Sequence, residues 1–400
     1  MRFFPQGFGT VLTMMLTMAV GSSAILSVAV SAPDSAPEIG VRATHVGLFT
    51  GAVYFVAMFS GSFCPGFIVK YGPIRVLQAT TLLSVLGLLV FTLASPLAVV
   101  MCAILLGIAY GPINPANAPV LLAVTNSGNR AFMFSIKQSG VTVGGVAAAL
   151  LVPLVAVWLN WKMGIISVAL LGIATLIILQ PLRRQFDSTR INVPLAWSFA
   201  TLIGPVRQIM RIPLLRGFAT VGFTYAGVQI CISSFFVVFL VQQGFTLVEA
   251  GVCFLFVNIG GIIGRIAWGG ISDKWLTPKY TLTVIGVISA VSLSGIFAVT
   301  DGWHKFFLYI FSFILGSSTH GWNGVFLSEV ANHAPQGESH NWTGGVQFLI
   351  YGGVAVLPPL FGFVILTTGG YTVPFLLIAL CVFLASISLL WLYHTYSSFH

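Results

Sequence analysis

The stretch PLRRQFDSTRINVPLAWSFATLIGPVRQIMRIP, residues 181–213, decides the fold because it is the only long and strongly basic connection in the chain. On either side of it, apolar segments of roughly 20 residues follow one another with very short links, such as Ser95-Pro96. About 20 helical residues cross the ~30 Å hydrocarbon core of a bilayer. Short links force successive helices to run antiparallel. The pattern therefore predicts two bundles of membrane-spanning helices joined by one long linker.

Six spans precede this linker and six follow it. They are expected near residues 8–30, 47–69, 76–94, 97–122, 134–157, 162–180, 214–241, 248–271, 280–299, 305–331, 343–366 and 371–393. We predict an all-α membrane protein with 12 transmembrane helices in two pseudo-symmetric six-helix bundles. The expected divisions are an N-terminal bundle (1–182), a cytoplasmic linker (183–212) and a C-terminal bundle (213–400). Within the linker, VPLAWSFATLIGPVRQIM (193–210) is expected to form an amphipathic helix on the inner leaflet, with a disordered tether as the alternative.

The composition excludes an ordinary soluble domain. Hydrophobic residues make up 57% of the 400 residues and charged residues only 6%, whereas about 25% is usual in soluble proteins. The formal charge of +9 is a topology signal and does not indicate nucleic-acid binding. All but three of the 17 Lys and Arg residues fall on one side of the predicted bundle, the exceptions being Arg42, Lys162 and Lys305. Both termini and the linker are therefore expected in the cytoplasm, with the protein in a bacterial inner membrane.

A similar loop follows the second and the eighth predicted spans. The second copy, GGISDKWLTPKYTL (269–282), combines a helix-ending glycine with an acid and a base at Gly269, Asp273 and Lys274. It resembles the loop motif G-x-L-x-D-(R/K)-x-G-x-(R/K)-(R/K) of the major facilitator superfamily, which occurs once in each half of those transporters. The resemblance extends over essentially the whole chain through the helix count and the central loop. It implies the major facilitator fold and a transport function.

The first copy of the loop, GFIVKYGPIRVL (66–77), lacks the aspartate of the motif. It keeps Gly66, Lys70, Gly72 and Arg75 but has Val69 where the family has aspartate. In that family the aspartate helps to lock the cytoplasmic gate, so symmetric locking of the two halves is not expected. The stretches FSIKQSG (134–140) and HGWNGVFLSEVANHAP (320–335) are also similar to bacterial organic-anion and cyanate-type permeases.

Two cations lie inside predicted spans. Arg265 precedes Asp273 by eight residues, a depth of about 12 Å, and Lys137 follows Arg130 by seven, a depth of about 10 Å. An ionisable group at the bilayer centre costs about 2.5–3.5 kcal/mol, so such residues are candidates for a substrate path. Alternatively, Arg265 extends towards the helix end as a structural residue, and Lys137 reaches cytoplasmic water or Glu329 and binds nothing.

The resemblance implies that the fifth helix packs beside the eighth, which would bring Lys137 close to Arg265. Two cations repel each other unless an anion lies near them, and none of the eight acidic residues falls at that depth. We therefore expect the substrate to supply the negative charge. An arginine on the eighth helix is also where the resembling monocarboxylate and oxalate carriers hold their substrate. Oxalate carriers place a second cation on the eleventh helix, but residues 343–366 contain none, which disfavours oxalate.

Several further residues complete the expected binding site and gate. His320, near the middle of the tenth span, either carries a coupled proton or packs between helices. Polar and aromatic side chains on facing helices are candidate cavity residues. They are Tyr54, Asn114, Asn117, Gln138, Gln229, Asn258, Trp322, Asn323, Gln347 and Tyr351. Following the family, Glu329 and Asp273 are assigned to the cytoplasmic gate with the loop cations Lys274, Arg75 and Arg130.

These observations predict a secondary active or facilitated transporter of a small organic anion, with a monocarboxylate favoured, that works by alternating access. Proton symport, exchange with a counter-anion and uniport all remain open. The rivals are an efflux carrier for drugs or hydrophobic solutes and a non-transporting sensor on a carrier fold. No enzyme activity, cofactor, metal or nucleic-acid partner is expected, because neither catalytic groupings nor paired cysteine spacings occur. We expect a monomer in the lipid bilayer.

Overall fold

The computed structural model describes residues 7–41, 46–188, 190–191, 199–300 and 302–397. These residues form helices and no strand. The helices in chain order are α1 (Phe8–Ile39), α2 (Val46–Tyr71), α3 (Pro73–Phe91), α4 (Pro96–Tyr110), α5 (Ile113–Val124), α6 (Arg130–Trp158), α7 (Trp161–Leu179), α8 (Arg183–Phe186), α9 (Phe199–Arg211), α10 (Pro213–Gln242), α11 (Leu247–Lys274), α12 (Pro278–Gly295), η2 (Ile296–Ala298), α13 (Lys305–Thr319), α14 (Asn323–His333), α15 (Ser339–Thr368) and α16 (Thr372–Ser397).

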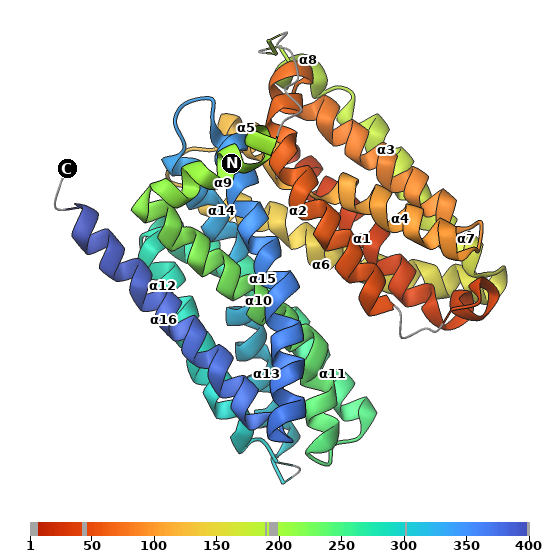
Figure 1. Cartoon of the computed structure of the whole chain (residues 1–400), viewed down its shortest axis with the longest axis vertical. Coiled ribbons are helices and arrows are strands. Elements are labelled where there is room, and N and C mark those ends of the chain that lie inside the picture. The colour runs from red at the N-terminus through yellow and green to blue at the C-terminus, as the bar shows by residue number, and fades with distance from the viewer. Residues whose placement is uncertain (1–6, 42–45, 189, 192–198, 301, 398–400) are drawn as a thin grey trace, which may run out of the picture. The chain divides into compact units, whose positions relative to one another are not determined.

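The chain folds into two compact units. The first comprises Met1–Asn126, Ile136–Arg207 and Ala331–Phe348, and the second comprises Ser127–Ser135, Gln208–Val330 and Leu349–His400. Within each unit the long helices lie side by side as a bundle (Figure 1). The first six residues of α6 therefore belong to the second unit, and the first ten residues of α15 belong to the first. The expected linker bounds at 183–212 stay a prediction.

The same pattern of neighbouring helices occurs in both units. In the first unit α2 packs on α4, α3 on α4, and α7 on both α1 and α3. In the second unit α11 packs on α13, α12 on α13, and α16 on both α10 and α12. Each pair in the second unit occupies the same place in chain order as its counterpart in the first. This is the internal repeat that the two loop copies predict.

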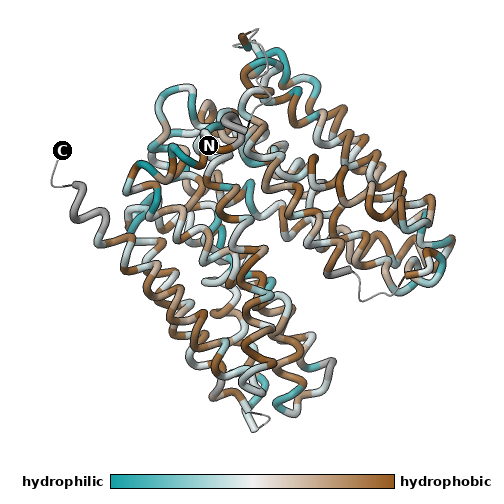
Figure 2. The backbone as a smooth tube through the Cα atoms, in the orientation of Figure 1, coloured by the Kyte–Doolittle hydropathy of each residue, from teal (hydrophilic) through white to brown (hydrophobic). Residues whose placement is uncertain are grey.

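Ten segments in the described part of the chain are long and apolar enough to cross a membrane. One of these, Pro96–Val124, joins α4 and α5 across a break. The other two of the twelve spans are formed by α12 and by α13 together with α14, which are shorter or more polar. Hydrophobic residues follow the lengths of the helices, and hydrophilic residues gather at many of the connections (Figure 2). The twelve-helix membrane fold is confirmed.

Two spans are broken in the middle. The fourth breaks at Gly111-Pro112, between α4 and α5, because proline lacks the N–H that continues the helix. The tenth breaks at residues 320–322, between α13 and α14, where a continuous helix over 305–331 was expected. A Cβ on Gly321 would clash with the Ser317 carbonyl oxygen and lie 2.8 Å from Trp268 Cδ1, so only glycine fits this bend.

Glycine also allows close helix contact in each unit. A Cβ on Gly144 of α6 would collide with the Ala19 carbonyl oxygen of α1. A Cβ on Gly260 of α11 would likewise collide with the Phe313 carbonyl oxygen of α13. Because glycine has no side chain, both positions permit close helix approach.

Two predictions lie partly outside the described residues. Two of the cations counted for the membrane topology, Arg2 and Arg42, are not described, and neither are the first residues (193–198) of the predicted amphipathic helix. The remainder of that segment is the helix α9. Its Ile209 is buried while Arg207 and Arg211 are exposed, which is the two-sided pattern of an amphipathic helix. Its placement on the inner leaflet stays a prediction.

Candidate functional site

The first candidate site surrounds Lys137, which is 1% exposed on α6. Its ammonium donates hydrogen bonds to the side-chain oxygens of Asn114, on α5, and of Gln138, the latter at 3.0 Å. The Asn114 amide in turn donates to Gln347 Oε1, on α15, at 3.1 Å. All four residues belong to the first unit. Four predicted site residues from three helices thus form one connected polar cluster, here called the lysine cluster.

The lysine cluster leaves the ammonium charge uncompensated. Both of its acceptors are neutral amide oxygens. In the part of the chain that the structure describes, no carboxylate forms an ion pair with Lys137. The position of Asn114 follows from the break in the fourth span, because it is the second residue of the new helix α5. The cluster therefore presents a buried positive charge held by dipoles.

The second candidate site surrounds Arg265, which is 2% exposed on α11. Its Nε donates to the backbone carbonyl of His320 at 2.9 Å. This carbonyl lies at the C-terminal end of α13, where backbone carbonyls lack helical partners and carry partial negative charge. Arg265 therefore stabilises the break in the tenth span. The contact is the one expected from the structural alternative for Arg265.

The His320 ring is also held within the second unit. Its Nε2 lies 3.2 Å from Ser233 Oγ on α10, and its Nδ1 lies 2.9 Å from Thr319 Oγ1. Both hydroxyls can donate or accept, so they suit either neutral tautomer of the ring. The ring joins α10 to the end of α13, as the packing alternative expects. Its predicted role in proton coupling stays a prediction.

A third polar group lies on the other side of the same break. The Oε1 atom of Gln229, on α10, accepts from Trp322 Nε1 at 3.3 Å and from Asn323 Nδ2 at 3.1 Å. Trp322 is buried and its ring packs edge-on against Tyr225 at 5.6 Å. Together with Arg265 and His320, these residues form what we call the arginine cluster. It lies entirely within the second unit.

The remaining candidate cavity residues lie outside the two clusters. The Asn258 amide donates to the Phe254 carbonyl of its own helix at 2.9 Å. Tyr54 packs edge-on against Tyr110 at 5.8 Å. Tyr351 is buried on α15.

Asn117 is a further candidate that the structure places apart from both clusters. Its Nδ2 donates to Thr17 Oγ1, on α1, at 3.2 Å. Its Oδ1 is buried and has no hydrogen-bond partner among the described residues. A buried acceptor without a partner is costly, so this oxygen is suited to accept a donor from water or from a solute.

The predicted gate residues of the second unit come together at the end of α11. The Asp273 carboxylate accepts from the backbone N–H groups of Ala131 at 3.0 Å and of Phe132 at 2.7 Å. It therefore caps the N-terminus of α6, where the helix dipole favours a negative charge. Arg130 lies within electrostatic reach of both Asp273 and Glu329. Lys274 is exposed beside them.

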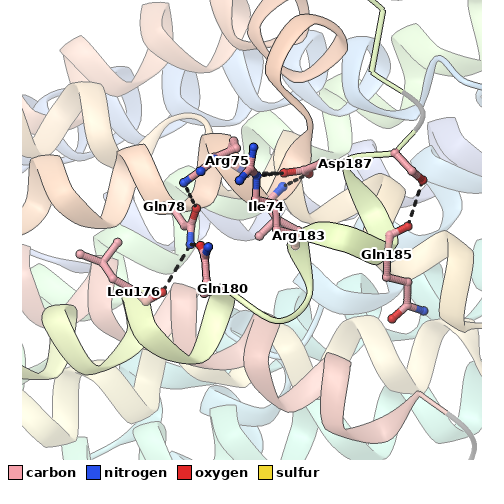
Figure 3. Close-up of polar contacts among 9 residues, drawn as sticks. Ile74, Arg75, Gln78, Leu176, Gln180, Arg183, Gln185 and Asp187 are labelled. Atoms are coloured by element: carbon pink, nitrogen blue, oxygen red, sulfur yellow. Dashed lines mark hydrogen bonds and ion pairs between the residues drawn. The ribbon is translucent and has the colours of Figure 1, made fainter.

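The predicted gate residue of the first unit, Arg75, lies in a cluster that contains an acid not predicted as functional (Figure 3). Asp187 accepts from the backbone N–H groups of Ile74 at 2.9 Å and of Arg75 at 3.2 Å, so it caps α3. Arg183 Nε lies 4.0 Å from the same carboxylate. Burial raises the pKa of Asp187, against the opposing effect of the two N–H donors and the nearby arginines. Its sequence signal was being the only acid in the basic stretch 181–213.

The described residues contain no group of three or more His, Cys, Asp or Glu side chains that could hold a metal ion. The two clusters consist of cations, amides, hydroxyls and aromatic rings. Such groups are suited to bind and orient a solute.

Comparison with solved structures identifies the fold. A variant of the E. coli fucose:proton symporter FucP is 16% identical with a TM-score of 0.72, covering 96% of this chain and 98% of FucP. The human organic anion transporter MFSD10 (TETRAN) is 13% identical with a TM-score of 0.75, covering 96% and 100%. A bacterial homologue of the iron transporter ferroportin is 14% identical with a TM-score of 0.75, covering 97% and 99%. These likenesses show the fold alone.

The sequence comparison establishes the family. No curated protein matches the chain significantly. Residues 8–349, however, match the Major Facilitator Superfamily over most of the chain's length. The protein is therefore a membrane transporter and not an enzyme, and the chain belongs to the major facilitator superfamily.

Proposed function

We propose that this transporter carries a small organic anion, with monocarboxylates as the substrate class, by alternating access of its two six-helix bundles. The observation that carries the proposal is the buried Lys137 ammonium, whose acceptors are neutral amides. A buried charge is costly unless an opposite charge compensates it. A carboxylate that enters the site supplies this compensation. Binding is then favoured for anions over neutral solutes and cations.

Arg265 is proposed as the second anchor. Its planar guanidinium matches the two oxygens of a carboxylate. The bond from its Nε to the His320 carbonyl fixes the plane of the group. One carboxylate has the right charge and size for such an anchor.

The neutral partners of the two cations are proposed to set substrate orientation. In the lysine cluster these are Asn114, Gln138 and Gln347, and in the arginine cluster they are Gln229, Trp322 and Asn323. Tyr54, Asn117, Asn258 and Tyr351 stay candidate cavity residues. His320, between two hydroxyls, is the candidate carrier of a coupled proton.

The gate is proposed at the cytoplasmic ends of the helices. Asp273 binds the start of α6, with Arg130 and Glu329 beside it. Breaking this contact would free α11 from α6 and open the path. We further propose that both termini and the linker lie in the cytoplasm, that the membrane is a bacterial inner membrane, and that the protein acts as a monomer.

Counterflow into proteoliposomes tests the proposed substrate class. Proteoliposomes that contain the purified chain are loaded with unlabelled acetate, lactate, pyruvate or oxalate, and entry of the labelled acid is measured. A neutral sugar and a lipophilic cation serve as controls. We expect counterflow of monocarboxylates that exceeds that of oxalate and of both controls. Counterflow of the cation alone would indicate an efflux carrier, and saturable binding without flux would indicate a sensor; either result overturns the proposal.

A further inference from the structure

A cavity of about 810 Å³ lies in the first unit, between α2, α3 and the fourth span. Its volume is in the range of ligand pockets. It is separate from the lysine cluster, since none of the residues of that cluster lines it. Its lining is apolar along α2 and basic at one end. The proposed transport of an anion gives this cavity no role.

An aromatic stripe forms the apolar wall of the cavity. It consists of Phe55, Phe59, Phe63, Phe67 and Tyr71, which recur at every fourth position of α2. Each step of four residues turns about 40° around the helix, so the five rings form a strip that winds about 160° around α2 along the cavity. At 1.5 Å per residue the strip is about 24 Å long, most of the ~30 Å hydrocarbon thickness. Phe55 is 56% exposed and Tyr71 is 44% exposed, so the strip is accessible from outside the unit.

Three guanidinium groups line the end of the cavity next to Tyr71. They belong to Arg75 at the start of α3, to Arg183 on α8 and to Arg190. Asp187 offsets part of this charge, because it lies near Arg75 and 4.0 Å from Arg183 Nε (Figure 3). Arg190 is exposed. Three cations and one carboxylate leave this end net positive.

The combination points to one chemistry. The basic end matches a phosphate, and the long aromatic strip matches an acyl chain. A small carboxylate substrate would use the arginines but would leave the strip empty. The turns at Lys70 and Arg75 belong to the basic side of the protein, where the head groups of anionic lipids lie. We infer that this cavity binds one anionic phospholipid of the inner leaflet, with its phosphate at the arginines and an acyl chain along the aromatic strip.

Binding of radiolabelled phosphatidylglycerol to the delipidated full chain in detergent tests the inference. Unlabelled phosphatidylglycerol, phosphatidylcholine and inorganic phosphate are the competitors. We expect competition by phosphatidylglycerol alone at micromolar concentration. Arg183→Gln with Arg190→Gln should weaken binding at least tenfold, because two charge-assisted hydrogen bonds are lost. Arg184→Gln with Arg207→Gln, which makes the same charge change at exposed residues outside the cavity, should leave binding within twofold.

A second pair of variants separates the acyl chain from the head group. Ala79 lines the cavity on α3, so Ala79→Trp should fill the apolar part and weaken phosphatidylglycerol binding at least tenfold with all three arginines intact. Leu82→Trp places the same ring at an exposed position of α3 outside the cavity and should have no effect. Full competition by inorganic phosphate, or equal binding by Ala79→Trp, would show a phosphate site without a lipid chain and overturn the inference. Equal competition by phosphatidylcholine would show that the lipid need not be anionic, which would also overturn the inference. Counterflow of the substrate by the same variants shows separately whether transport survives.

Discussion

Replacement of Lys137 by glutamine separates transport from stability. In the folded protein the ammonium donates to Asn114 and Gln138, and Asn114 continues to Gln347. A glutamine amide keeps donor capacity towards these oxygens but removes the charge. The variant therefore changes the electrostatic potential of the lysine cluster while retaining a polar side chain there.

Loss of the Lys137 charge should weaken anion binding but should not lower the stability of the protein. A hydrogen bond to a charged group is worth about 1.5–3 kcal/mol, and each 1.4 kcal/mol is about tenfold in affinity, so anion binding should weaken about ten- to a hundred-fold. Burying an ammonium costs several kcal/mol before its partners compensate it. Lys137 is 1% exposed, so removal of its charge should leave the melting temperature unchanged or raise it.

The assay is counterflow of a labelled monocarboxylate together with thermal unfolding of the same purified protein in detergent. Lys70→Gln is the matched control, since Lys70 lies at the end of α2, where its ammonium lies 5.5 Å from the Tyr71 ring. Counterflow by Lys137→Gln equal to that of the parent would refute the anchor role. A fall in counterflow that simply follows a large fall in melting temperature would show a structural role instead.

Three further changes test the other sites. Arg265→Lys keeps the charge but loses the planar donor pair and the Nε contact to His320. Monocarboxylate counterflow should therefore fall at least about tenfold. Counterflow equal to that of the parent protein would contradict the role of Arg265 as second anchor. Asp273→Ala removes the cap of α6 and should lower the unfolding free energy by about 1 kcal/mol. Asp273→Asn can still cap the helix and should lower it less. Equal melting temperatures for the two variants would argue against capping. Burial raises the pKa of Asp187 above 3.8, its value in the unfolded chain. The parent should therefore gain stability over Asp187→Asn as the pH falls through the pKa of the folded protein, and the gain should level off below 3.8. A difference in melting temperature between the two proteins that does not change with pH would contradict this.

The fold was predictable because membrane insertion imposes a length and a polarity on every span. The twelve spans and the short links follow from apolar runs in the sequence, and the break at Gly111-Pro112 falls at a proline. The break at residues 320–322 was missed because it contains no proline. It depends on the close approach of Gly321 to the Ser317 carbonyl oxygen and to Trp268, which is a tertiary contact.

The candidate site was predictable only in part. A buried charge is visible in an apolar segment, so Lys137 and Arg265 could be singled out, and both are buried. Their partners depend on the rotation of each helix, which a sequence of uniformly apolar spans leaves undetermined. Asn258, for example, has the composition of a cavity residue but binds the carbonyl of Phe254 on its own helix.

The two broken spans explain why the polar groups gather where they do. A helix break leaves backbone N–H and C=O groups without helical partners. Within a membrane these groups need hydrogen bonds from nearby polar groups of the protein. In the first unit, Asn114 follows the break between α4 and α5, binds Gln347 and accepts from Lys137. In the second unit, Asn323 follows the break between α13 and α14 and binds Gln229, while the nearby His320 carbonyl accepts from Arg265. Each unit thus joins one broken helix, one asparagine–glutamine pair and one buried cation. Arg265 has a packing role at its break, whereas the acceptors of Lys137 are neutral amides, and this is the physical reason to look for an anion beside Lys137.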